Sequence, residues 1–229
     1  MKWFLTIAVA LLLVGCGTPK PAQPAAQQPG MAADTTHPAT PADTTAAKSA
    51  TPPSAVKGVL KDTLVPTQLP ADLYLTIKVK DYGTMKIKFY TMDAPRNVAN
   101  VANLAIKGFY NGLIFHRLIP GFMIQGGDPS GDGTGGPGYT VPAEISRRHD
   151  KGSMAMARTG DNINPQRASS GSQFYICFKP APSLDGQYTV IGQLKEGMDV
   201  LDKLEKVQTG AMDKPVKPVV MEQVTVTTE

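Results

Sequence analysis

The sequence predicts a mainly β domain, in which many short strands and two helices form a barrel with helical caps. From residue 73 onward, apolar and polar residues alternate in several short runs, which is the period of a half-buried strand. Two stretches, 93–108 and 198–207, place apolar residues at helical spacing. Residues 17–66 differ from both, because they are rich in Pro, Ala, Thr, Gln and Ser.

Residues 1–16 are typical of a bacterial lipoprotein signal peptide. Lys2 is followed by an apolar run, 3–14, that is too short to span a bilayer. The letters LVGC that end at Cys16 resemble a lipobox, in which the cysteine is acylated, palmitate included, and the signal is cut before it. An ordinary secretory signal that contains a cysteine is the alternative. We predict a membrane-anchored protein of the bacterial cell envelope on the periplasmic face, and Gly17 after the cysteine favours the outer membrane.

Residues 17–66 are expected to form a disordered tether, because their composition offers too little apolar surface to offset the entropy of ordering. The remaining part, 67–229, has the length of one ordinary domain. Its 18 Lys+Arg and 16 Asp+Glu leave a net charge near +2, and the basic residues are scattered. We therefore expect no nucleic-acid partner, and we expect a monomer.

The two cysteines, Cys16 and Cys177, are not expected to pair, because Cys16 lies in the export signal. Cys177 lies in an apolar strand pattern. It is expected to be a small buried hydrophobe, with a reactive thiol as the alternative.

The domain is expected to begin with a hairpin and a helix. The runs 73–79 and 85–89 alternate as strands on either side of a turn. Asp93 is the expected N-cap of the helix, and Pro95 lies in its first turn. Gly108 is its expected stop.

The next stretch, 115–128, predicts two short strands joined by a Pro-Gly turn. Alternation places Arg117 and Leu118 on opposite faces of the first strand. The loop 126–138 holds seven glycines. A phosphate-binding loop is not favoured there, because no Gly-Lys-Ser/Thr ends it and no helix is predicted after it. A flexible or tightly turning connection is the better interpretation.

The last third of the domain adds strands, loops and the second helix. Met198, Leu201 and Leu204 define that helix by their spacing. Strands are expected at 152–158, 170–176, 188–192 and 219–227, and loops at 159–170 and 180–187.

Four blocks of the sequence resemble the cyclophilin family of peptidyl-prolyl cis-trans isomerases. They are FHRLIPGFMIQGGD at 115–128, GSMAMAR at 152–158, SGSQFYI at 170–176 and LDGQYTVIGQLKEGMDVLDKL at 184–204. All four stand in the family's order, and the resemblance covers residues 73–227. It implies a closed eight-stranded antiparallel barrel capped by two α-helices. It also implies an isomerase that acts on X-Pro bonds of exported proteins without a cofactor.

The resemblance makes Arg117 the catalytic residue. Isomerisation needs no proton transfer, because its barrier is the loss of amide resonance as the C–N bond twists. A guanidinium that donates to the prolyl nitrogen binds the twisted amide more strongly than the planar one. From spacing alone, a structural arginine paired with a carboxylate is an equally good interpretation.

The resemblance also implies an apolar socket for the proline ring. Its expected members are Phe122, Met123, Tyr175 and Leu184. Tyr188 is a further expected substrate-binding residue. Tyr175 and Tyr188 depart from the family, which usually has phenylalanine at the first position and, in many members, histidine at the second.

Polar groups are expected to hold the substrate backbone. Gln125 and Gln173 are implied in this role, and Gln125 is expected to orient Arg117 as well. Ala155 and Met156 are expected to pair with the peptide through their main chains, as an edge strand does. Many relatives have asparagine in place of Met156.

Other classes of function find less support in the sequence. His116 and His149 are not clustered with further ligands, so no metal site is expected. Ser169, Ser170 and Ser172 lack a His/Asp relay, which argues against a hydrolase. The remaining alternative is a chaperone or scaffold module that grips proline-containing peptides with little turnover.

Overall fold

The computed structural model of the chain describes residues 58–229. The predicted signal peptide, Cys16 and most of the predicted tether lie outside the described residues. The strands and helices of the described part are, in chain order, β1 (Gly58–Val59), β2 (Leu73–Val79), β3 (Gly83–Phe89), α1 (Pro95–Ile106), β4 (Ile114–Ile119), β5 (Met123–Gly126), β6 (Thr140–Val141), β7 (Ser153–Met156), β8 (Ser169–Ser170), β9 (Phe174–Cys177), β10 (Val190–Glu196), α2 (Met198–Leu204) and β11 (Val219–Thr228). Three short 3-10 helices lie in connections: η1 (Pro66–Gln68), η2 (Pro182–Leu184) and η3 (Ala211–Asp213).

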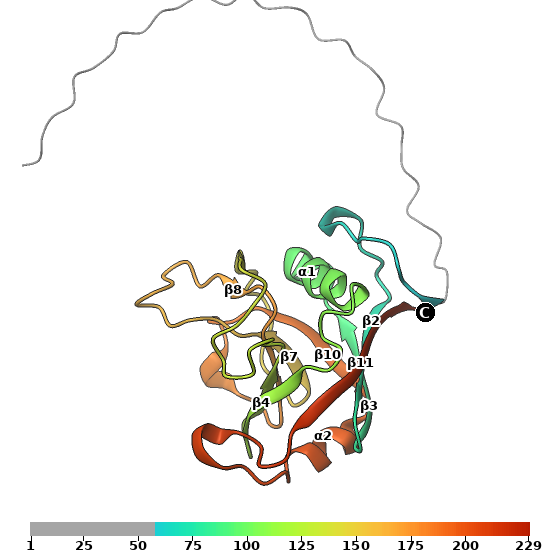
Figure 1. The fold of residues 1–229 in the computed structure, drawn as a ribbon. Coiled ribbons are helices and arrows are strands. Elements are labelled where there is room, and N and C mark those ends of the chain that lie inside the picture. Colours follow the sequence, from blue (N-terminus) through green and yellow to red (C-terminus); the bar gives the residue numbers. More distant parts are fainter. Residues whose placement is uncertain (1–57) are drawn as a thin grey trace, which may run out of the picture. The chain divides into compact units, whose positions relative to one another are not determined.

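Eight strands close into a barrel. Their order is β11-β2-β3-β10-β7-β9-β5-β4, and a further pairing of β11 with β4 closes the ring. All of these pairings are antiparallel. Figure 1 shows α1 and α2 at opposite ends of the barrel. The predicted closed eight-stranded antiparallel barrel with two helices is therefore confirmed.

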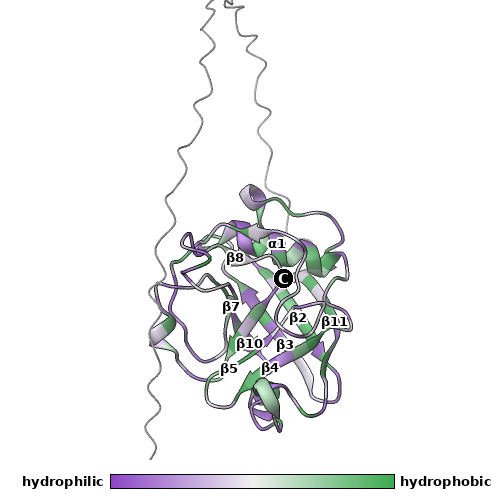
Figure 2. Cartoon of the chain, turned by 60° about the vertical axis from the view of Figure 1, so that its left-hand side comes forward, coloured by the Kyte–Doolittle hydropathy of each residue, from purple (hydrophilic) through white to green (hydrophobic). Residues whose placement is uncertain are grey.

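The core lies inside the barrel, because alternate residues of each strand face inward. In β2, Leu73, Leu75 and Ile77 are fully buried, whereas the two residues between them are partly exposed. Figure 2 shows the resulting mixture of hydrophobic and hydrophilic residues along the strands. The alternation read from the sequence thus gives the correct inward face.

The predicted elements occur in the predicted order, although some are shorter. β7 replaces the expected strand 152–158, and β9 replaces 170–176. The predicted loop 159–170 is irregular except for β8, which pairs with β6.

The predicted N-cap Asp93 does not cap the first helix, and its carboxylate pairs with Arg147 instead, at 2.8 Å. The carboxylate of Glu144 accepts the main-chain N–H groups of Arg96 and Asn97 at 3.2 and 2.9 Å. A distant loop therefore supplies the acceptor that the first turn needs.

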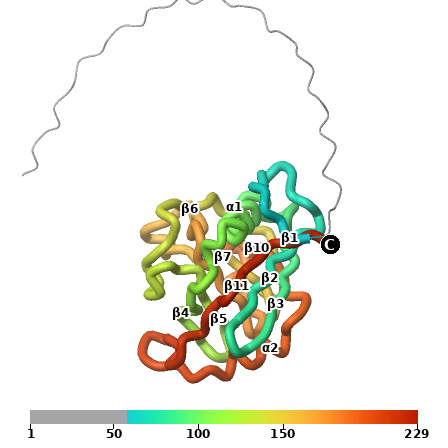
Figure 3. Tube along the Cα trace, turned by 45° about the vertical axis from the view of Figure 1, so that its right-hand side comes forward, coloured from blue at the N-terminus to red at the C-terminus, as the bar shows by residue number. Residues whose placement is uncertain are grey.

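The folded part begins before the predicted boundary at residue 67. β1 adds to the end of β11 near the C-terminus, as Figure 3 shows. The N–H of Leu60 donates to the carbonyl of Val226 at 2.8 Å. The side chain of Asn103 in α1 binds both the N–H and the carbonyl of Leu64, at 2.7 and 2.8 Å. Residues 58–66, which were assigned to the tether, are thus held on the barrel.

The glycine-rich loop 126–138 turns around one buried carboxylate. Asp128 is 1% exposed and accepts the main-chain N–H groups of Ser130, Asp132 and Gly133 at 2.6 to 3.1 Å. The loop leads to β6 and not to a helix. The interpretation as a tightly turning connection is confirmed.

Candidate active site

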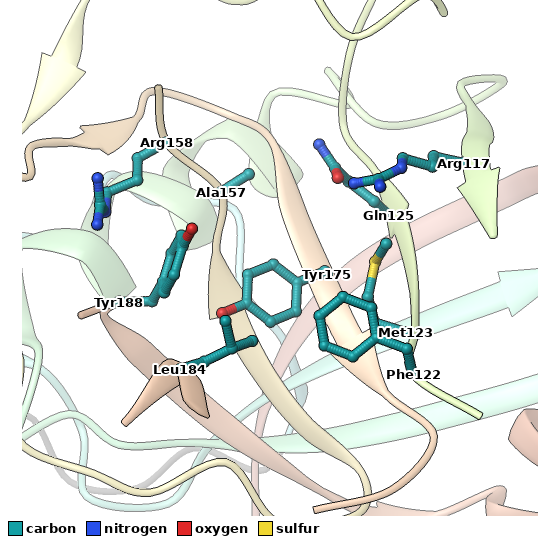
Figure 4. A pocket seen from close by; sticks show the side chains of 9 residues that line it. All are labelled: Arg117, Phe122, Met123, Gln125, Ala157, Arg158, Tyr175, Leu184 and Tyr188. Atoms are coloured by element: carbon teal, nitrogen blue, oxygen red, sulfur yellow. The ribbon is translucent and has the colours of Figure 1, made fainter. Parts of the chain in front are cut away.

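A groove with a volume of about 230 Å³ opens on the outer face of the barrel. Its lining residues, shown in Figure 4, are Arg117, Phe122, Met123, Gln125, Ala157, Arg158, Tyr175, Leu184 and Tyr188. Beneath it lies a small apolar cluster that is separate from the barrel interior and includes Met123, Ala155 and Tyr175. The groove therefore has an apolar floor of its own.

The register of four neighbouring strands builds this floor. Arg117 of β4 lies opposite Gln125 of β5, Gln125 lies opposite Tyr175 of β9, and Tyr175 lies opposite Ala155 of β7. Residues paired in this way face the same side of a sheet. The row of paired residues thus runs across the outer face of the barrel. Ile176, the residue after Tyr175 in β9, points the other way and packs inside the barrel.

Arg117 lies at the polar end of the groove, and its side chain is 44% exposed. Its Nε donates to Oδ2 of Asp213 at 3.3 Å. Asp213 and the preceding Met212 both have positive φ, of 59° and 58°, which is uncommon for residues other than glycine. The arginine is therefore both paired with a carboxylate and placed in the groove, so the ion pair does not remove it from the candidate site.

Among the described residues Gln125 makes no hydrogen bond to Arg117, and its amide Nε2 donates to Oε1 of Gln173 at 3.0 Å. Gln173 does not line the groove and is 6% exposed. Its own amide donates to the carbonyls of Gly133 and Gly135, at 3.0 and 2.8 Å. Gln173 thus connects the glycine-rich loop to Gln125.

The expected socket residues come together at the apolar end. Phe122, Met123, Tyr175 and Leu184 line the groove side by side (Figure 4), and Tyr188 joins them. The rings of Tyr175 and Tyr188 meet edge to face, with centroids 5.8 Å apart. Burial raises the pKa of the Tyr175 hydroxyl well above its ordinary value, which keeps it protonated.

Ala155 and Met156 do not form an edge strand. β7 pairs with β10 on one side and with β9 on the other, because the barrel is closed. The N–H of Met156 donates to the carbonyl of Thr189 at 2.9 Å. Ala155 is fully buried, and Met156 faces the barrel interior. The expectation of an edge strand at these two residues is therefore wrong, and neither residue is among those that line the groove.

Ala157 and Arg158, the next two residues, line the groove instead. The guanidinium of Arg158 lies over the ring of Tyr188, 4.6 Å from its centroid. Its Nε donates to the carbonyl of Gln187 at 3.0 Å, and it pairs with Asp161. No periodic pattern indicates this role, because β7 ends at Met156 and the alternation of the strand stops there.

Two further titratable groups, Cys177 and His116, are buried within the protein. Burial raises the pKa of Cys177 to about 12, so its thiol stays protonated and behaves as the predicted small hydrophobe. Burial also lowers the pKa of His116, a residue that is 6% exposed.

Among residues 58–229, no three His, Cys, Asp or Glu side chains lie close enough together to hold a metal ion. No helix of this part is both long and apolar enough to cross a membrane.

The sequence matches a family model and curated proteins that share one described activity. Residues 74–226 match the model of the family described as cyclophilin type peptidyl-prolyl cis-trans isomerase/CLD. A peptidyl-prolyl cis-trans isomerase of Helicobacter pylori is 44% identical over 144 residues, which are 61% of this chain and 84% of that protein. One from Synechococcus elongatus is 50% identical over 115 residues, or 50% and 75% of the two chains.

Solved structures resemble this fold as well. The crystal structure of a Cryptosporidium parvum cyclophilin type peptidyl-prolyl cis-trans isomerase superimposes with a TM-score of 0.64 and 31% identity. The match covers 68% of this chain and 98% of that one. A second structure of the same protein, obtained in the presence of the dipeptide Ala-Pro, gives a TM-score of 0.63 with 30% identity over 68% and 99% of the two chains.

Proposed function

The chain belongs to the cyclophilin family and is a peptidyl-prolyl cis-trans isomerase, and we propose that it acts on X-Pro bonds of exported polypeptides while anchored to a membrane through Cys16. The isomerase activity follows from the family match along the whole barrel. The export signal supports the class of substrate, and the lipobox supports the anchor.

The groove suits a reaction that needs no covalent intermediate. The uncatalysed X-Pro bond isomerises in tens to hundreds of seconds, because rotation must break amide resonance. In the described part of the chain, the lining residues of the groove include no carboxylate, histidine, serine or cysteine. What the groove offers is the guanidinium of Arg117 and the amide of Gln125 at one end and an apolar surface at the other, where the guanidinium of Arg158 is stacked on Tyr188.

We assign to Arg117 the role of hydrogen-bond donor to the prolyl nitrogen. Within residues 58–229 its terminal nitrogens make no hydrogen bond, since Asp213 takes only Nε. As the amide twists, its nitrogen becomes pyramidal and accepts a hydrogen bond that the planar amide accepts poorly. The bond is thus stronger in the transition state than in the ground state, which is the condition for catalysis.

The apolar end of the groove holds the proline ring. Phe122, Met123 and Leu184 present hydrocarbon surface around Tyr175, and all four line the same cavity. Burial of the ring there supplies binding energy without hydrogen bonds. With the ring fixed, the residue before the proline can rotate past it. Gln125, in the same row as Arg117, is placed to bind the peptide backbone.

The juxtaposition of the Arg117 guanidinium with the apolar socket carries this mechanism, and Arg117→Ala tests it. The full-length protein, purified in detergent, should accelerate cis-to-trans isomerisation of a proline tetrapeptide. In the variant kcat/KM should fall by about 100-fold or more, as for other lost transition-state donors. Arg147→Ala is the control, because Arg147 pairs with Asp93 away from the groove. Wild-type rates in Arg117→Ala would contradict the assigned role.

A further inference from the structure

Three residues form a hydrogen-bonded chain beneath the socket. The hydroxyl of Tyr175 lies 2.9 Å from Nε2 of His149, and Nδ1 of His149 lies 2.9 Å from Oδ1 of Asp185. The His149 side chain is fully buried, and its ring is nearly parallel to the Tyr175 ring, at 7°. Tyr175 stands where the family usually has phenylalanine. The hydroxyl at which this series of hydrogen bonds begins is therefore one that many relatives lack.

The chemistry of the partners sets the direction of these hydrogen bonds. An ionised carboxylate only accepts, so Nδ1 of His149 carries the proton that Asp185 binds. In the neutral ring, Nε2 is then an acceptor, and the Tyr175 hydroxyl donates to it. Hydrogen bonds from His149 also hold the pKa of Asp185 below its usual range, which favours the ionised form. Each of the three side chains has a hydrogen-bond partner, so the two hydrogen bonds together define one arrangement of Tyr175, His149 and Asp185.

His149 also holds the loop that carries Leu184. Its main-chain N–H donates to Asp185 at 2.8 Å, and its carbonyl accepts the N–H of Ala181 at 2.9 Å. Ala181 and Asp185 flank η2, whose last residue is Leu184. His149 thus forms hydrogen bonds at both ends of η2, the short helix that forms a wall of the groove. The same residue binds Tyr175, which forms the floor.

From this geometry we infer that His149 is a positioning residue for substrate binding, which sets the spacing between Tyr175 and Leu184 through Asp185. His149 itself does not line the groove. Its ring also meets Tyr188 at 90°, with centroids 6.4 Å apart, so it contacts a third residue of the apolar end. The inference rests on the isomerase activity, because the spacing it controls is that of the proline socket.

The effect is expected in KM and not in kcat. The socket contacts the proline ring equally in the planar and the twisted states, so a loosened socket weakens both alike. Arg117, which acts on the twisted state, belongs to β4 and has its own partner in Asp213. A defect in His149 therefore leaves the donor in place.

Tyr175→Phe and Asp185→Ala test the inference in the full-length protein with a proline tetrapeptide. Each should raise KM by about three- to tenfold, the effect of one lost hydrogen bond, while kcat stays within twofold of wild type. The two effects should not add in the double variant, because both break the same chain. Tyr175→Phe keeps the ring and follows the common residue of the family, so this variant is expected to fold.

Tyr110→Phe is the matched control. Tyr110 is also buried, and its hydroxyl donates to the carbonyl of Ser172 at 3.1 Å, but the residue does not line the groove. The Tyr110→Phe variant should have a lower Tm than wild type and an unchanged KM. If Tyr175→Phe and Asp185→Ala likewise lower Tm and leave KM unchanged, the role of His149 is purely structural and the inference fails. An inactive wild type would instead refute the proposed function.

Discussion

Asp213 forms an ion pair with Arg117, and no local pattern of the sequence indicates this contact. It reaches Arg117 from η3, where two successive residues adopt the left-handed conformation. Such conformations cost energy and often occur at functional sites. By binding Nε, Asp213 restricts the rotation of the guanidinium and directs its terminal nitrogens.

Asp213→Asn should therefore lower kcat/KM by about two- to fivefold at low salt. Larger effects are not expected, because both side chains are nearly half exposed and such pairs contribute about 1 kcal/mol or less. The difference from wild type should shrink as salt screens the pair. Asp199→Asn, which removes an exposed pair with Lys203 on α2, is the control. Equal rates at low salt would show that Asp213 does not position Arg117.

At the scale of elements, the glycine-rich loop between β5 and β6 supports the polar side of the groove. Gln173 binds two carbonyls of this loop and also accepts from Gln125. The loop in turn is folded around Asp128, which accepts three main-chain N–H groups. The position of Gln125 thus depends on a carboxylate outside the groove.

Asp128→Asn should lower the free energy of unfolding by about 1–3 kcal/mol at neutral pH, because an amide cannot accept three N–H groups. Burial alone raises the pKa of Asp128, but the hydrogen bonds from Ser130, Gly133 and Asp132 outweigh it and hold the pKa below its ordinary value of 3.8. A lowered folded-state pKa stabilises the fold above about pH 3.8, and this contribution is lost as the pH falls through the folded-state value.

Chemical denaturation of wild type and Asp128→Asn between pH 3 and pH 7 measures this contribution. The two stabilities should differ most at pH 7 and converge in acid. Asp202→Asn is the control, since Asp202 pairs with Lys151 at the surface. A difference that does not change with pH would argue against the ionised carboxylate as the stabilising group.

At the scale of the whole molecule, the barrel is a rigid support for a site on its outer face. Closure by β11 and β4 leaves no open edge in the ring of eight strands. A peptide therefore cannot extend this ring as an added strand. β1 joins the N-terminal end of the described chain to β11, outside the row of strands that carries the groove.

The proposed anchor is tested on the whole chain. Wild-type protein expressed in a Gram-negative host should fractionate with membranes and gain the mass of its acyl chains, because several chains hold far better than one. Cys16→Ser should release it to the soluble fraction with its isomerase activity intact. Cys177→Ala is the control, because Cys177 is buried and not expected to be acylated. Membrane attachment of Cys16→Ser would refute the lipid anchor.

Much of the fold and part of the site could be predicted from the sequence. Alternation located the hairpin of β2 and β3, and a Pro-Gly turn located that of β4 and β5. Phe122, Met123 and Tyr175 were identified because the motifs that carry them resemble a known family. These signals are local, since each depends on residues close together in the chain.

Only the tertiary structure determined the contacts between distant segments. Arg117 and Asp213 are 96 residues apart, and Gln125 and Gln173 are 48 apart. Local periodicity says which face a residue occupies but not which strand lies beside it, and barrel closure decided that β7 has two neighbours. For this reason the sequence by itself determined the family and most of the elements, and its motifs pointed to Arg117 as a residue of the groove. The partners of that arginine, the support of Gln125 and the exclusion of Ala155 and Met156 from the groove followed from pairing across the closed barrel.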